Sequence, residues 1–266
     1  MNDYKEESFA LITGASEGIG RAIAEEIALR KMNIIMVALP GPKLQKEACE
    51  LQQRYGIKVV TYETDLTEDE APERLYEWVK KEGLRVKVLV NNAGLGHEGL
   101  FETSSWDFID QMMKLNMRAV IHMTHLFLPQ LKTCKEAYIL NVGSMASFRP
   151  MPYKNIYTAT KSFIFYFSRA LREELRHTSI KVSVLCPGPV PTSMAVKKRM
   201  NSKGFIGKMM VITPDKVARI AVNKMIKGKP VIVPGFINRA ILILEKAVPR
   251  SRQMKIVIRM FKEEGC

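Results

Sequence analysis

Hydrophobic residues recur along the chain in two kinds of segment that alternate. Short apolar runs, typical of buried strands, are followed by longer stretches in which apolar residues recur at helical spacing. Strands are expected at Phe9–Thr13, Ile34–Leu39, Val59–Tyr62, Val86–Val90, Ala137–Val142 and Val182–Cys186. Helices are expected at Ile19–Leu29, Lys43–Tyr55, Glu68–Lys81, about Trp106–Leu131 and about Tyr157–His177. Because strands that alternate with helices require right-handed crossovers, the expected fold class is α/β: a doubly wound parallel sheet with helices on both faces.

Residues 1–266 are expected to form a single domain, since one α/β domain of this length is ordinary and buries a substantial core. No internal repeat or low-complexity tract indicates a solenoid or linked modules. The regular pattern weakens after Pro187, and residues 187–212 are rich in Pro, Met, Lys and Gly. Long irregular segments in compact domains usually serve a function, so we expect a substrate lid there. Residues 236–266 form a basic, apolar C-terminal extension.

Composition and cysteine usage narrow the class of protein. Hydrophobic residues make up 47% and charged residues 26%, as in soluble globular proteins. The four cysteines lie far apart without a CxxC motif or a histidine cluster, so we expect reduced thiols and no metal site. The N-terminal residues lack the pattern of a secretory signal, and no run of about 18 apolar residues occurs. We therefore expect a cytoplasmic protein.

The net charge of +14 is concentrated in the C-terminal quarter. Residues 194–262 hold 17 Lys or Arg and two acidic residues, Asp215 and Glu245, which gives +15 for this stretch and −1 for the rest. A solvated basic face is the simpler interpretation. Attraction to a phosphate, a carrier or a membrane surface is the alternative. No nucleic-acid-binding module accompanies the charge, so we expect no nucleic-acid partner.

A glycine-rich turn joins the first expected strand to the first expected helix, and its sequence is Thr13-Gly14-Ala15-Ser16-Glu17-Gly18-Ile19-Gly20. Glycine permits a tight turn there, lets the backbone approach a pyrophosphate and allows the helix to pack close to the strand. The helix N-terminus then offers unpaired N–H groups and a positive dipole end to phosphates. A glycine pattern alone is weak evidence, but its place between strand and helix predicts dinucleotide binding.

The end of the second strand bears on the choice of cofactor. An acidic residue there would favour NAD by bonding the ribose 2′-hydroxyl, whereas an arginine would accommodate the 2′-phosphate of NADP. The sequence has neither, because Leu39-Pro40-Gly41-Pro42 leads directly to Lys43. Leu39 carries no charge, so no carboxylate repels the 2′-phosphate of NADP, and Lys43 could reach this phosphate. We therefore expect NADP(H) to be favoured over NAD(H).

Tyr157 and Lys161 lie four residues apart in an expected helix, and hence on one face. A free tyrosine has a pKa of about 10, and a neighbouring cation favours the phenolate and lowers that pKa. Such a pair can protonate a carbonyl oxygen or deprotonate an alcohol. A Tyr and a Lys at this spacing are nevertheless commonplace on exposed helices, so the pair needs support from its context.

That context is a series of polar motifs at the carboxyl ends of the expected strands. Asn91-Asn92-Ala93-Gly94 follows the fourth strand, Gly143-Ser144 follows the fifth, and Pro187-Gly188-Pro189-Val190-Pro191-Thr192 follows the sixth. Asn116 lies in the long expected helix. Open parallel sheets bind ligands at the carboxyl ends of their strands, so these motifs predict one site.

Together the motifs resemble the short-chain dehydrogenase/reductase family, with TGxxxGxG, NNAG, a helical Asn, Ser, YxxxK and PGxxxT in the same order over about residues 8–235. The resemblance implies a Rossmann fold of about seven strands and an NAD(P)-dependent oxidoreductase, a carbonyl reductase or alcohol dehydrogenase. The resemblance implies that Tyr157 is the acid/base and that Lys161 lowers the pKa of Tyr157 and binds the nicotinamide ribose. It also implies that Ser144 forms a hydrogen bond with the substrate oxygen and that Asn116 holds a water molecule for proton supply.

The resemblance also implies a set of residues that bind the cofactor. Asp65 matches the aspartate that contacts adenine, Asn91 supports the sheet and the cofactor, and Thr192 binds the carboxamide. The full set is Gly14, Ser16, Gly18, Ile19, Gly20, Asp65, Leu66, Asn91, Ala93, Gly94, Tyr157, Lys161, Pro187, Gly188, Val190 and Thr192. Leu39 and Pro40 depart from the family, because NADP-preferring relatives often carry basic residues there.

Some interpretations stay open at this point. Ser147 could take the role assigned to Ser144. His97 and Glu98 could line the substrate pocket or form a surface loop. The apolar residues near Ser144 could form an apolar wall or fill the core, and they are Met145, Phe148 and Met151. The apolar residues of the expected lid, interleaved with basic ones, suit a hydrophobic ketone or alcohol that bears an anionic group or carrier.

The C-terminal extension and the rival function also stay open. The extension could lie on a membrane surface, although packing over the active site or against another subunit is the simpler expectation. We expect a homodimer or homotetramer. The rival to an enzyme is a non-catalytic, dinucleotide-sensing binding protein of the same fold.

Overall fold

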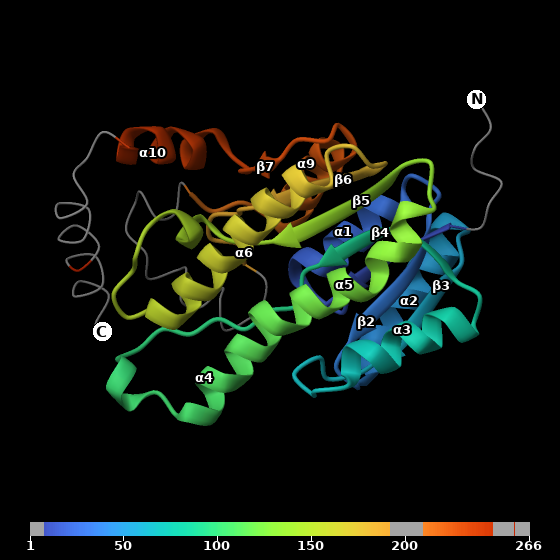
Figure 1. Ribbon diagram of the computed structural model, residues 1–266, viewed down its shortest axis with the longest axis horizontal. Helices are drawn as coiled ribbons and strands as arrows, with labels where there is room; N and C mark the ends of the chain where they lie inside the picture. Colours follow the sequence, from blue (N-terminus) through green and yellow to red (C-terminus); the bar gives the residue numbers. More distant parts are fainter. Residues whose placement is uncertain (1–7, 192–209, 247–257, 259–266) are drawn as a thin grey trace.

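The computed structural model describes residues 8–191 and 210–246 together with residue 258, and its core is one sheet of seven parallel strands (Figure 1). The strands are β1 (Ser8–Thr13), β2 (Asn33–Ala38), β3 (Val59–Glu63), β4 (Arg85–Asn91), β5 (Ala137–Val142), β6 (Ile180–Leu185) and β7 (Val231–Ile232). The helices are α1 (Gly18–Ala28), α2 (Pro42–Tyr55), α3 (Ala71–Lys81), α4 (Trp106–Met113), α5 (Ala119–Lys132), α6 (Asn155–Glu174), α9 (Pro214–Ile226) and α10 (Phe236–Lys246). Three short turns are η1 (Phe101–Thr103), η2 (Lys114–Arg118) and η3 (Met145–Phe148). The expected α/β fold is confirmed.

The order of the strands fixes the place where a ligand can enter. The sheet runs β3-β2-β1-β4-β5-β6-β7, so the chain builds outward from β1 in one direction and then from β4 in the other. All the strand pairs are parallel. The reversal of direction falls between β1 and β4, and such a switch point leaves a crevice outside the carboxyl ends of the strands.

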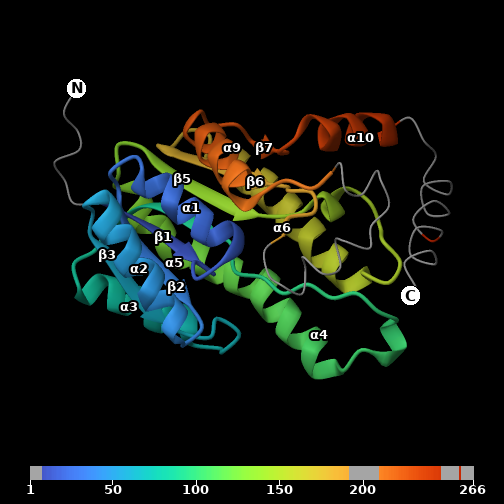
Figure 2. The same cartoon turned by 180° about the vertical axis from the view of Figure 1, so that it is seen from behind.

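Two apolar layers bury the two faces of the sheet, and the alternation of side chains along each strand divides the residues between them. In β1, Ala10 and Ile12 belong to one cluster while Phe9 and Leu11 belong to the other. The first cluster is covered by α1, α2 and α9 (Figure 2), and the second by α3, α5 and α6 (Figure 1). The strands are therefore buried on both sides, which explains their continuous apolar sequences.

The expected elements differ from the structure in a few places. The single helix expected at Trp106–Leu131 is instead α4, a π-helical turn η2 and α5, because η2 contains one wider turn around Asn116. The helix expected at Glu68–Lys81 begins at Ala71 with Pro72 in its first turn, and the one expected from Tyr157 begins at Asn155. The pattern did not reveal α9 and β7. Most of the expected lid lies outside the described residues.

Candidate active site

The glycine turn after β1 has the backbone that only glycine adopts easily. Gly14 and Gly18 have positive φ angles of 64° and 58°. A Cβ on Gly20 would lie 2.2 Å from the Gly14 carbonyl oxygen and 2.4 Å from the Asn92 Nδ2. No side chain fits there, so the three glycines make a tight, closely packed entry into α1.

The turn is tied to the NNAG segment by two polar side chains. Thr13 Oγ1 accepts hydrogen bonds from the backbone N–H groups of Asn92 and Ala93, both at 3.0 Å. Asn92 Nδ2 donates to the carbonyls of Thr13 at 2.9 Å and Gly14 at 3.1 Å. The sequence argument overlooked both clamping residues; the adjacent Asn pair and the Thr that opens the turn were the available signals.

The N-terminus of α1 has the donors that a pyrophosphate requires. Its N-cap residue, Glu17, makes no side-chain capping hydrogen bond, and the first turn contains no acidic residue. Ser16 is partly exposed beside this turn, whereas the Ile19 side chain is buried. Unpaired N–H groups and the helix dipole therefore favour an anion here, and the residues fit the dinucleotide that the sequence predicts.

The opposite end of the expected cofactor site lies around the carboxyl end of β2. Leu39 is 62% exposed, while Lys43 forms an ion pair with Glu17 at 2.6 Å between Nζ and Oε2. Asp65 accepts a hydrogen bond from the Thr67 backbone at 2.9 Å, and Leu66 is buried in the core. Lys43 thus lies within reach of the glycine turn but already has an acidic partner.

Lys161 lies on α6 with its ammonium group buried against the carboxyl end of β5. The side chain is 6% exposed, and Nζ donates to the Val142 carbonyl at 2.9 Å. Burial without a nearby carboxylate disfavours the charged form and lowers the pKa of Lys161 from 10.5 to about 8. Lys161 can therefore exchange a proton near neutral pH.

Tyr157 precedes Lys161 by one helical turn, and its pKa differs from the simple expectation. Burial raises the pKa of the Tyr157 phenol, a hydrogen bond with the Ser144 side chain opposes that rise, and Cys186 adds to it. Lys161 Nζ lies 5.9 Å from the centre of the tyrosine ring and donates to the Val142 carbonyl at 2.9 Å. The pKa of Tyr157 is therefore raised, whereas the sequence predicts a lowered one.

Asn116 is buried in the π-helical turn η2, where it joins three segments of the chain. Its amide donates to the Leu95 carbonyl at 2.8 Å and to Thr160 Oγ1 at 3.1 Å, and its Oδ1 accepts from the Leu95 N–H at 2.8 Å. A Cβ on Gly94 would meet Asn116 Oδ1 at 3.0 Å and Lys161 Nζ at 3.2 Å. The structure therefore brings Gly94, Asn116 and Lys161 together, and the Asn116 side chain itself is occupied by protein groups.

Ser144 and Ser147 begin and end one short turn, but their hydroxyl groups have different surroundings. Ser144 Oγ accepts a hydrogen bond from the Ala146 N–H at 3.1 Å and interacts with Tyr157. Ser147 is buried and donates to the Lys161 carbonyl at 2.8 Å. Of the two serines, Ser144 is the one that lies against Tyr157, while Ser147 anchors η3 to α6.

Asn91 lies at the end of β4 within a buried polar network. Its amide donates to Asn141 Oδ1 at 2.8 Å and Thr124 Oγ1 at 3.1 Å, and Asn141 continues the chain of bonds to Ser168 at 2.9 Å. The network joins β4, β5, α5 and α6. It holds the two central strand ends together below the site.

The loop after β6 supplies Pro187, Gly188 and Val190, and it packs against the beginning of α10. The Pro187 carbonyl accepts from the Met145 N–H at 2.9 Å, and Val190 is buried. A Cβ on Gly188 would lie 2.7 Å from the Nδ2 of the buried Asn238, which the sequence argument overlooked. Thr192 and the expected lid residues up to 209 lie outside the described residues.

Two loops next to Tyr157 are joined by an ion pair and a backbone hydrogen bond. Gly96 lies against the Tyr157 ring, since a Cβ there would be 3.7 Å from Cε2. Beyond it, Lys154 Nζ pairs with Glu98 Oε2 at 3.0 Å, and the Gly99 N–H donates to the Tyr153 carbonyl at 2.8 Å. The Glu98 side chain therefore joins this loop to the N-terminus of α6.

Other residues proposed for the substrate side lie nearby. His97 Nε2 lies 2.9 Å from Ser104 Oγ, within the same loop. Met145 and Phe148 pack against the third apolar cluster, which includes Val184 and Cys186. Their apolar wall thus belongs partly to the core.

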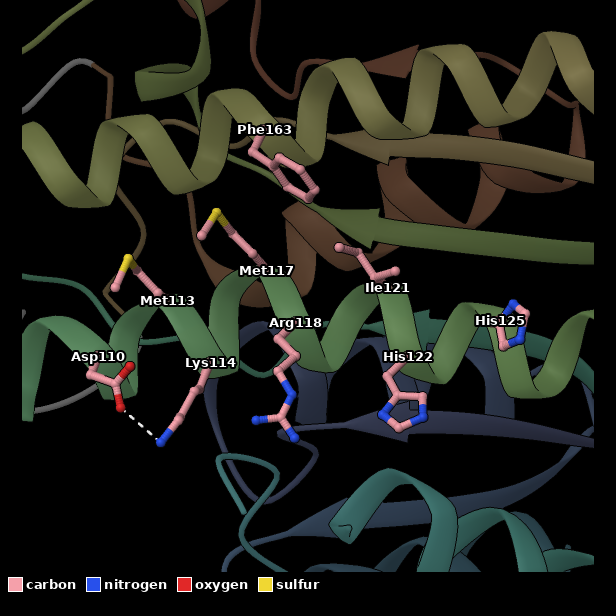
Figure 3. Close-up of a pocket in the computed structure, with 9 residues that line it drawn as sticks. All are labelled: Asp110, Met113, Lys114, Met117, Arg118, Ile121, His122, His125 and Phe163. Carbon is pink, nitrogen blue, oxygen red and sulfur yellow. Dashed lines mark ion pairs between the residues drawn. The ribbon is translucent and has the colours of Figure 1, made fainter. Parts of the chain in front are cut away.

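A separate groove of about 660 Å³ lies between α6 and the α4–η2–α5 segment (Figure 3). Figure 3 shows Phe163 pointing from α6 toward Met117 and Ile121, while Lys114 pairs with Asp110 at 2.7 Å. Phe163 follows Lys161 by two residues and so points to the other side of the helix. The groove is therefore distinct from the site around Tyr157.

Within the described part of the chain, no group of three or more His, Cys, Asp or Glu is arranged to hold a metal ion. No helix in the same residues has the length and apolar character needed to cross a bilayer.

Comparisons with known proteins agree with this geometry. A family model described as short chain dehydrogenase matches residues 8–203. The very-long-chain 3-oxoacyl-CoA reductase of Anas platyrhynchos is 34% identical over 194 residues, which is 71% of this chain and 61% of that protein. The 17-beta-hydroxysteroid dehydrogenase type 3 of Homo sapiens is 34% identical over 224 residues, or 83% of this chain and 69% of that one. The chain therefore spans less than two thirds of the avian reductase's length.

Solved structures share the whole fold. A 7beta-hydroxysteroid dehydrogenase superposes with a TM-score of 0.85 at 25% identity, covering 94% of this chain and 96% of that chain. A short-chain dehydrogenase from Sphingobium yanoikuyae in complex with NADPH gives 0.76 at 25% identity, covering 91% and 97%. Since the family model matches most of the chain and the relatives agree with it, the chain belongs to the short-chain dehydrogenase family.

Proposed function

We propose that the chain is an NADP(H)-dependent oxidoreductase that interconverts a ketone and an alcohol, with Tyr157 as the acid/base. The observation that carries this proposal is the gathering of Ser144, Tyr157 and Lys161 against the loop that follows β4. Family membership and the names of the relatives, which are reductases and dehydrogenases, support the same reaction class.

The proposed chemistry follows from the protonation states of the site. A bound nicotinamide supplies or accepts the hydride. Because burial raises the pKa of Tyr157, the phenol is protonated near neutral pH and is ready to donate a proton to a carbonyl oxygen. Ser144 Oγ already accepts from Ala146, so its O–H can donate to the same oxygen. Lys161, with a pKa of about 8, can replace the proton that the tyrosine loses.

The preference for NADP(H) over NAD(H) is part of the proposal. Exposed Leu39 places no carboxylate at the expected ribose, and the NADPH complex of the Sphingobium relative is consistent with this choice. Lys43 would have to exchange Glu17 for a 2′-phosphate. Titrations with NADPH and NADH test the preference. Lys43→Gln should weaken NADPH binding about fivefold and leave NADH binding nearly unchanged, and tighter NADH binding by the unaltered protein would contradict it.

For the substrate we propose a hydrophobic ketone or alcohol that bears an anionic group or carrier. Met145 and Phe148 offer apolar surface next to Ser144, and the printed names of the relatives refer to steroid and very-long-chain acyl substrates. A panel of aliphatic, steroidal and small polar carbonyls tests this proposal. Turnover limited to the small polar compounds would exclude it.

Substitution of the tyrosine tests the mechanism. Tyr157→Phe removes only the hydroxyl, so carbonyl reduction should fall by a factor of about 100 to 10,000 while NADPH binding is retained. Tyr166→Phe is the matched control, because Tyr166 is an exposed tyrosine on the same helix, and it should keep full activity. An active Tyr157→Phe would contradict the mechanism. NADPH binding without turnover of any panel compound would favour the dinucleotide-sensing alternative.

For the expected homodimer or homotetramer, we propose that a second copy packs on the groove of Figure 3. Ile121 and Phe163 line it and are exposed, and grouped exposed apolar residues are typical of association surfaces. Sedimentation equilibrium of Phe163→Ser should show dissociation, with Leu100→Ser as an exposed control.

A further inference from the structure

Helix α10 has one face that is firmly attached to the fold. Asn238 is 1% exposed and donates to the carbonyls of Pro234 at 3.0 Å and Met210 at 3.3 Å. Leu242, one turn later, packs against the apolar cluster that contains Val184 and Val233. Because Asn238 also lies against Gly188, α10 is held in a fixed position beside the loop after β6.

The opposite face of α10 is apolar and exposed. Phe236, Ile243 and Leu244 are 81%, 69% and 67% exposed, and Ala240 lies between them at helical spacing. Both views place α10 at the margin of the molecule beyond β7 (Figures 1 and 2). Three large apolar side chains grouped on one exposed helical face indicate an association surface.

Positive charge lies beside this apolar face. Arg239 is exposed on α10, between Phe236 and Ile243 in the sequence, and Lys229 is exposed just before β7. Burial lowers the pKa of Lys224, and the like charges of Arg239 and Lys229 lower it further. Within the described ranges no salt bridge neutralises any of the three.

The sign of this charge distinguishes between the candidate occupants of the face. A second copy joined symmetrically through α10 would add the same cations to the interface and no anionic group to balance them. Residues 247–266 of the chain hold five basic and two acidic residues, so they carry no net negative charge to complement the face. An anionic lipid surface complements both features, because apolar side chains enter the acyl boundary while cations stay at the phosphates.

We propose that the outer face of α10 binds an anionic membrane surface, with Phe236, Ile243 and Leu244 inserted at the interface and Arg239, Lys224 and Lys229 at the lipid phosphates. The attachment through Asn238 then fixes the protein with the loop after β6 next to the lipid. This binding does not depend on the proposed activity, and it is measured without substrate or cofactor.

The test is co-sedimentation of the full chain with vesicles of phosphatidylcholine and phosphatidylglycerol, compared with phosphatidylcholine alone. We expect binding only to the anionic vesicles, and weaker binding as salt is added. Phe236→Ser and Ile243→Ser should each weaken it about tenfold or more, and Arg239→Gln about fivefold. Trp106→Ser and Lys81→Gln, at exposed apolar and basic positions on other helices, are the matched controls and should bind normally.

Each other outcome overturns the proposal. Failure to bind anionic vesicles would show that the face serves another purpose. An equal loss in Trp106→Ser would show that binding is not specific to α10. If Phe236→Ser changed the sedimentation coefficient without vesicles, the occupant would be a second copy; circular dichroism of each variant verifies that it is folded.

Discussion

The cofactor side and the substrate side of the site are built by different means. Around the glycine turn, backbones pack so closely that little room is left for a side chain at Gly14 or Gly20, and Thr13 and Asn92 hold this packing through bonds to backbone groups. Around Tyr157, two loops are joined by an ion pair between the partly buried side chains of Glu98 and Lys154. The first arrangement allows almost no substitution, whereas the second leaves the loops free to differ in sequence.

The difference has an energetic basis. A side chain added at Gly20 would collide with backbone, which cannot move without distorting β1 and α1. An ion pair near the surface contributes little, and its loss shifts a loop without unfolding the sheet. Changes on the cofactor side are therefore expected to abolish folding of the site and NADPH binding. Changes on the substrate side are expected to alter only the affinity for the substrate.

The strongest test of the comparison is Gly20→Ala. The added methyl lies 2.2 Å from a carbonyl oxygen, so we expect a loss of stability of about 3 kcal/mol and no measurable NADPH binding. Gly56→Ala is the control, because Gly56 also has a positive φ but no atom within 4 Å of an added Cβ. It should lose about 1 kcal/mol and keep NADPH binding. Urea unfolding and fluorescence titration measure both, and normal binding by Gly20→Ala would refute the steric argument.

Lys161 lies where the two regions meet, and it gives stability a dependence on pH. The lysine holds its proton up to about pH 8 in the folded state and up to about 10.5 in the unfolded chain, so the unfolded state binds more protons between these values. Stability should therefore rise with pH in this window. Lys161→Met lacks the effect, so the difference in unfolding free energy between the two proteins should change by about 2 kcal/mol between about pH 7.5 and about pH 9.5. If the difference in unfolding free energy between the two proteins were the same at both pH values, the Lys161 ammonium would not be buried.

Local sequence was sufficient to predict the parts of the fold that depend on short-range patterns. The six strands from Phe9 to Cys186 and the helix bearing Tyr157 were each visible as a buried run or a helical repeat. The glycine turn was visible because few residues tolerate its backbone. The π-helical turn at Asn116 was not, because a single wider turn leaves the apolar pattern of the long helix almost unchanged.

Interactions between distant residues were the parts that the sequence did not reveal. Asn92 clamps a turn about 80 residues earlier, and Asn238 holds α10 against Gly188; neither is marked by its neighbours in sequence. The raised pKa of Tyr157 likewise depends on burial and on Ser144 and Cys186, which come from other parts of the chain, and spacing on one helix reveals none of these. These features depend on tertiary packing.

The smallest expected effect is on the substrate side and concerns Glu98 and Lys154. The pair is partly buried at 3.0 Å, so a double-mutant cycle with Glu98→Gln and Lys154→Gln should give a coupling energy of about 1 kcal/mol. The exposed pair of Glu77 and Lys80 on α3 is the control and should give about 0.3 kcal/mol. Because the pair joins the loop of Glu98 to the N-terminus of α6, its loss should raise KM severalfold with kcat nearly constant. A fall in kcat with KM unchanged would mean that the loop positions the reacting groups themselves, and the contrast between the two regions would then not hold.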